Sequence, residues 1–175
     1  MGLRFENLDG RTRELMVEEI DFDLAGSGLY ESRYLNQRAK AAWPELTKDA
    51  ARQGSDDTLS QALSRGMLVS HYEKRKPKGG TTMAAVPYNA HETMAQGQFN
   101  MYYMRALALR VLAGEATGLE VYRAKGVDVP RESSERMIGT RIDAQLVLDE
   151  LRRTKGVDPD IRIPLPNSGL TVRLV

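Results

Sequence analysis

The sequence predicts a single α+β domain, rich in helix, with a small and mainly antiparallel sheet. Apolar residues recur at helical spacing in most of the chain, the segment 89–113 is apolar on several sides, and 119–123 alternates like a strand. The length of 175 residues suits one domain. Within it we distinguish a helical N-terminal region 1–70, a basic loop or arm 71–82, and an α+β core region 83–175.

Short helices are expected to fill the first 66 residues. Asp9 can cap a helix over 11–24, where Met16 and Ile20 lie on one face, and Gly26-Ser27-Gly28 ends it. The following segments are a short strand 29–34, a helix from Asn36 to Trp43, a helix 45–53 opened by Pro44, and a helix that begins at Ser55 or Asp56 and stops before Gly66.

The middle of the chain holds the most polar segment and the most apolar helix. Pro77 and Gly79-Gly80 predict a loop or arm over 71–82, and a strand 81–86 follows. Asn89 is a suitable N-cap, with Glu92 three residues later as in a capping box. The helix that it opens runs to Ala113, and its broad apolar surface predicts a central, buried position.

The C-terminal third is expected to complete the sheet. A strand at 119–123 precedes a short helix that starts at Ser133 or Ser134 and a longer one capped by Asp143. The runs 161–165 and 170–175 resemble a terminal hairpin, with Pro164 placing the first run at an edge. The predicted sheet therefore consists of 81–86, 119–123 and the C-terminal hairpin.

Composition excludes several classes of protein. The chain has no cysteine and two histidines, so disulfide scaffolds, cysteine-ligated zinc sites and thiol nucleophiles are excluded. Its apolar runs fall short of the roughly 18 residues that cross a bilayer, and we expect no membrane association. Cysteine-free chains fit a reducing compartment, so we expect a cytoplasmic protein or one within an assembled particle.

The net charge of +1 hides an uneven distribution. Residues 1–70 carry nine basic and twelve acidic residues, a balance of −3, whereas 71–91 carry four basic residues and one acidic residue, a balance of +3. The concentrated basic stretch is Lys74, Arg75, Lys76 and Lys78, with Tyr72 beside it. These five are the candidate nucleic-acid or partner-binding residues, because clustered cations neutralise phosphates and displace their counterions. Two other interpretations explain the same pattern. The segment is a solvated loop, or it docks on an acidic surface such as helix 14–23 of another copy.

The long helix supplies a second set of candidates. Tyr102 and Tyr103 point about 100° apart on a helix, so we expect one of them to face outward, with Arg105 nearby. Exposed tyrosines are common interface anchors. Packing in the core is the competing interpretation for this aromatic group.

Enzymatic motifs are absent from the sequence. Position 95 is alanine, so His91-Glu92 does not form H-E-x-x-H, and 78–82 lacks the spacing of a phosphate-binding loop. A hydrolase or nuclease would use Asp or Glu, with Asp21 and Asp23 as the named candidates, together with His71 or His91. We therefore assign no catalytic residue, metal site or cofactor, and favour a non-enzymatic protein.

Four segments carry a resemblance to a known group of proteins. They are QFNMYYMRALALRVLAG (98–114), LEVYRAKGVDVPRESSERMIG (119–139), PNSGLTVRL (166–174) and the opening LRFENLDGRTRELMVEEIDFD. Together they resemble uncharacterised bacterial proteins, some of them associated with prophages and mobile elements. The resemblance implies a phage or mobile-element role and transfers no catalytic residue.

Three functions remain after these exclusions. The first is a structural or assembly subunit, such as a phage particle protein, that acts through protein–protein contacts as a homo-oligomer or in a larger assembly. The alternative is a nucleic-acid-binding accessory or regulatory protein that uses the basic 74–78 segment. The second alternative is a hydrolase or nuclease that depends on carboxylates and histidine.

Overall fold

The computed structural model describes residues 2–64, 66–126 and 131–175 and shows an α+β domain. Its helices are α1 (Gly10–Ala25), α2 (Gln37–Gln53), α3 (Asp56–Ser64), α4 (Ala90–Leu112), α5 (Glu132–Glu135) and α6 (Ala144–Thr154). Its strands are β1 (His71–Arg75), β2 (Thr81–Ala85), β3 (Leu119–Arg123), β4 (Arg141–Ile142) and β5 (Leu170–Leu174).

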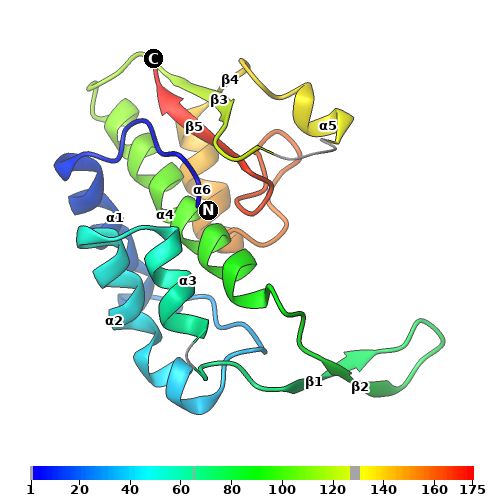
Figure 1. The fold of residues 1–175 in the computed structure, drawn as a ribbon. Helices are drawn as coiled ribbons and strands as arrows, with labels where there is room; N and C mark the ends of the chain where they lie inside the picture. Colours follow the sequence, from blue (N-terminus) through cyan, green and yellow to red (C-terminus); the bar gives the residue numbers. More distant parts are fainter. Residues whose placement is uncertain (1, 65, 127–130) are drawn as a thin grey trace.

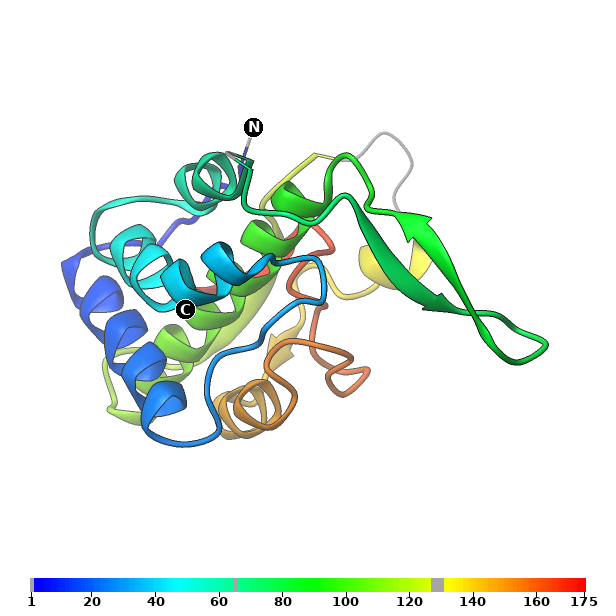
Figure 2. The ribbon, with the colours of Figure 1, turned by 90° about the horizontal axis from the view of Figure 1, so that it is seen from below.

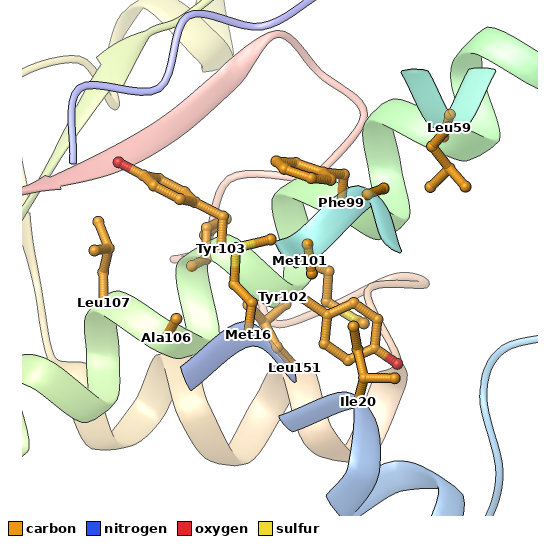
Figure 3. Close-up of a cluster of buried hydrophobic side chains, with 14 of the residues drawn as sticks. Met16, Ile20, Leu59, Phe99, Met101, Tyr102, Tyr103, Ala106, Leu107 and Leu151 are labelled. Atoms are coloured by element: carbon orange, nitrogen blue, oxygen red, sulfur yellow. The ribbon is translucent and has the colours of Figure 1, made fainter. Parts of the chain in front are cut away.

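The helix α4 is the centre of the fold, as its apolar pattern predicts. The helices α1 and α3 pack on one side of it, and α6 and the strand β5 pack on the other (Figure 1). Figure 3 shows Met16 and Ile20 from α1, Leu59 from α3 and Leu151 from α6 meeting the side chains of α4. This main cluster draws on both the N-terminal and the C-terminal regions and so joins them in one packed unit.

Three of the predicted helix caps are present. The side chains of Asp9, Asn36 and Asp143 accept hydrogen bonds from backbone N–H groups in the first turns of α1, α2 and α6. The fourth, Asn89, precedes α4 without a capping side-chain hydrogen bond, so the predicted capping box is wrong. Its backbone φ of −98° and ψ of 14° leave the extended conformation that a capping residue adopts.

Two short elements of the N-terminal region differ from prediction. The helix α2 continues through Pro44, where we expected two helices, because Ala39 and Trp43 before the proline and Thr47 after it are all buried. The burial of these side chains stabilises the continuous helix by more than the lost backbone hydrogen bond at the proline costs. Residues 29–34 form no strand, and an isolated β-bridge between Leu35 and Leu68 follows directly after them.

The predicted sheet is divided into two. The strands β4, β3 and β5 form one antiparallel sheet in that order, and β1 and β2 form a separate hairpin. The prediction of a C-terminal hairpin is wrong: residues 161–165 form turns, and β5 pairs with β3 instead. Pro164 and Pro166 lack the N–H groups that strand pairing requires, while Ile163 is buried in the core.

The β1–β2 hairpin extends away from the rest of the molecule, as Figures 1 and 2 show from two directions. We call residues 71–85 the arm. The segment 71–82, predicted as a basic loop or arm, thus lies in a paired hairpin, and the second strand of this hairpin does not join the central sheet. Among the described helices, none is both long enough and apolar enough to cross a bilayer.

Candidate functional site

The arm is a regular antiparallel ribbon. Tyr72 lies opposite Ala84 and Lys74 opposite Thr82, so these four side chains share one face, while Glu73 and Met83 lie opposite each other on the other face. The ribbon reverses at Gly79 and Gly80, whose φ values of 91° and 77° are strained for other residues. The glycines that sequence reasoning assigned to a loop thus close a hairpin.

The four predicted cations occupy the outer part of this ribbon. Lys74, Arg75, Lys76 and Lys78 are all exposed. Within the described part of the chain, none of them forms an ion pair, whereas many other basic residues do. Their positive charge is therefore not paired with a carboxylate of any described residue, although Glu73 lies on the same strand.

Aromatic and cation–π contacts hold the base of the arm. The ring of Tyr72 lies 4.9 Å from that of Tyr34 in an edge-on arrangement, and the guanidinium of Arg33 lies 4.5 Å from the centroid of the Tyr72 ring. Val69 donates a backbone hydrogen bond to Tyr34, and Val86 donates one to Ser70. The sequence pointed to Tyr72 but missed Arg33, because the segment 29–34 shows no basic cluster of its own.

A cavity of about 430 Å³ lies at this base. Its walls come from the loop 30–34, the segment 87–98 that follows β2 into α4, and two loops at 156–158 and 165–167. No local sequence pattern marks it, since these segments meet only through the packing of α4. Tyr34 lines the cavity and also contacts Tyr72, so the cavity adjoins the arm directly.

The predicted interface residues lie in the interior, and their assignment to an exposed surface is wrong. Tyr102, Tyr103 and Arg105 are each at most 1% exposed. The hydroxyl of Tyr102 donates to Asp23, and that of Tyr103 accepts from the backbone N–H of Asn7. Apolar residues surround α4 on every side, so even its polar side chains are enclosed.

The Arg105 guanidinium lies in a buried ion cluster. Its Nε donates to Glu19 at 2.7 Å and its Nη1 donates to Asp23 at 2.7 Å, while Arg152 donates to the same Glu19 carboxylate from the protein's surface. Burial by itself would raise the pKa of Glu19, but the hydrogen bonds from Arg152 and the charge of Arg105 lower it overall. Burial raises the pKa of Tyr102, so its hydroxyl stays protonated and donates a hydrogen bond to Asp23.

This cluster bears on the hypothesis that the arm docks on helix 14–23 of another copy. The acidic face of helix 14–23 is largely used within the chain: Glu19 and Asp23 are buried, and Asp21 pairs with Lys48 at 2.6 Å. It is therefore a poor docking surface for a basic arm.

The carboxylates and histidines proposed for a hydrolase are not brought together. Asp23 is held by Arg105 and Tyr102, His71 lies on the arm beside Ser70, and His91 lies in the first turn of α4. Across residues 2–64, 66–126 and 131–175, no group of three or more His, Asp or Glu is arranged to hold a metal ion.

Comparison with protein-family models, with curated proteins and with solved structures finds no match to this chain.

Proposed function

We propose that the protein is a non-enzymatic nucleic-acid-binding protein that holds the phosphate backbone with its arm. The observation that carries the proposal is the position of Lys74, Arg75, Lys76 and Lys78 on an extended ribbon, exposed and free of ion pairs within the described residues. Cations that the protein does not neutralise remain available to phosphates.

The shape of the arm suits the same partner. A two-stranded ribbon is narrow enough to follow a nucleic-acid groove or a single strand, and backbone phosphates lie at regular spacing along either. Arg33 and Tyr72 extend the surface from the cationic tip to the body of the protein. A guanidinium stacked on an aromatic ring is a suitable platform for an unpaired base.

An assembly role is the second candidate. Met83 is 65% exposed on the arm, and two-stranded hairpins are only marginally stable without further contacts. An acidic protein surface, in a phage particle or another assembly, would supply such contacts and pair with the same cations. The charge of the arm favours the nucleic-acid role, since Glu19, Asp21 and Asp23 of α1 are already paired within the chain.

Replacing all four cations by glutamine tests the proposal. The wild-type protein should bind a fluorescein-labelled (dT)20 with an affinity that falls about 50-fold between 50 and 200 mM salt, as four phosphate contacts on a single strand predict. The variant should lose nearly all of this salt dependence in fluorescence anisotropy titrations.

The matched control removes the same amount of charge elsewhere. Arg4, Arg52, Arg136 and Arg141 are exposed and lie outside the arm, so their replacement by glutamine should leave the salt dependence close to wild type. Equal losses in both variants would show a non-specific charge effect and contradict the proposal. Oligomers in light scattering that the arm variant converts to monomers would favour the assembly role instead.

A further inference from the structure

We propose that the cavity at the base of the arm receives one unstacked nucleobase of a single strand whose phosphates lie along the arm; this rests on the proposed function. The cavity volume of about 430 Å³ falls within the range of small-ligand sites and exceeds what one base requires. Its position beside Tyr72 places it where a strand leaving the arm would meet the body.

A buried polar group in the cavity wall requires a partner. Gln98 lines the cavity and is only 5% exposed; its Nε2 donates to the backbone carbonyl of Lys155 at 3.1 Å. Its Oε1 receives no hydrogen bond from any described residue. Rotating the Gln98 amide by half a turn would place its Oε1 against the carbonyl oxygen of Lys155. The assignment of nitrogen and oxygen in this amide is therefore fixed. Unpaired buried acceptors are costly. This oxygen is itself covered in the structure, so a ligand N–H would pair with it once the Gln98 side chain turns toward the cavity.

The remaining polar groups of the wall also suit a base. The side chains of Asn89, Thr93 and Asn167 line the cavity and form no hydrogen bonds with other described residues. Amide side chains can pair with the donor and acceptor edges of bases. Every nucleobase carries at least one N–H donor, so Gln98 alone does not select among them.

The aromatic and charged groups fix the orientation of such a ligand. Tyr30 and Tyr34 line the cavity and offer faces on which a base can stack. Asp158 is the charged residue among those that line the cavity. Its side chain is exposed, and its backbone φ is 53°. A carboxylate there repels phosphate, so the backbone should remain on the cationic arm while the uncharged base enters.

Comparing a base-bearing strand with an abasic one tests the inference. The probes are labelled (dT)12 and a 12-mer of the same phosphate backbone in which every site is abasic. Wild-type protein should bind (dT)12 roughly 5- to 150-fold more tightly, the range expected for stacking of one base. Equal affinity for the two probes would overturn the inference while leaving the proposed function intact, whereas binding to neither would overturn the function.

Gly97 offers a variant that fills the cavity. It lies in α4 on the cavity wall, and a Cβ there would meet Asn167 at an ordinary 3.5 Å. Gly97→Leu should reduce the preference for (dT)12 over the abasic strand at an unchanged salt dependence, and Gly97→Ala should keep the wild-type preference. If Gly97→Leu does not fold, Tyr30→Ala removes a stacking face instead and should reduce the preference. Wild-type preference in a folded blocking variant would contradict the inference.

Discussion

Replacing Arg105 by methionine is expected to lower the free energy of unfolding by about 3–5 kcal/mol. The guanidinium is fully buried and neutralises both Glu19 and Asp23, which are each 3% exposed. Methionine fills much of the space but leaves two carboxylates in a setting that disfavours charge. Arg152 reaches only Glu19, so Asp23 would keep a single neutral donor, the hydroxyl of Tyr102.

Urea denaturation followed by circular dichroism measures this loss. Arg152→Met is the matched control, since that side chain is partly exposed and its removal should cost about 1 kcal/mol. Adding Glu19→Gln and Asp23→Asn to Arg105→Met should recover part of the stability, because no buried charge then remains. A loss below about 1 kcal/mol in Arg105→Met would contradict the description of this cluster as a structural centre.

Shortening the arm is expected to remove nucleic-acid binding without unfolding the protein. Joining Tyr72 to Ala84 through Asn-Gly deletes residues 73–83, keeps the two cross-strand pairs His71–Ala85 and Tyr72–Ala84, and closes them with a favoured two-residue turn. Four phosphate contacts on a single strand contribute roughly 10³-fold to affinity at 50 mM salt, and this should be lost.

The stability of the shortened protein should stay within about 0.5 kcal/mol of wild type, as for surface changes. The hydrogen bonds recorded for residues 73–83 lie within the hairpin itself, and the contact between Tyr72 and Tyr34 is retained. Anisotropy titration and urea denaturation of the same preparation separate the two effects. Retained affinity in a folded, shortened protein would place the nucleic-acid surface elsewhere.

Features that depend on neighbouring residues could be predicted from the sequence. Asp9, Asn36 and Asp143 cap helices because their side chains reach backbone groups three residues away. The broad apolar surface of α4 predicted its central position, and the glycines and lysines of the arm predicted an exposed basic segment.

Features that depend on residues far apart in the chain could not be predicted from the sequence. Arg105 looks like a surface cation in the sequence, and its carboxylate partners lie more than 80 residues away on α1. Nothing in the run 170–174 indicates that it pairs with β3 and not with the nearer run 161–165. The cavity required loops and a helix from four parts of the chain, and the orphaned Gln98 acceptor is visible only once they meet.

Photochemical cross-linking of the wild-type protein to a single strand tests the account most directly. A (dT)20 containing 5-iodouracil reacts with aromatic side chains that it contacts, and mass spectrometry identifies the modified peptides. We predict cross-links at Tyr72 on the arm and at Tyr30 or Tyr34 in the cavity wall, because one strand should contact both. Cross-links confined to segments outside 29–34 and 71–89 would contradict a binding surface formed by the arm and its base.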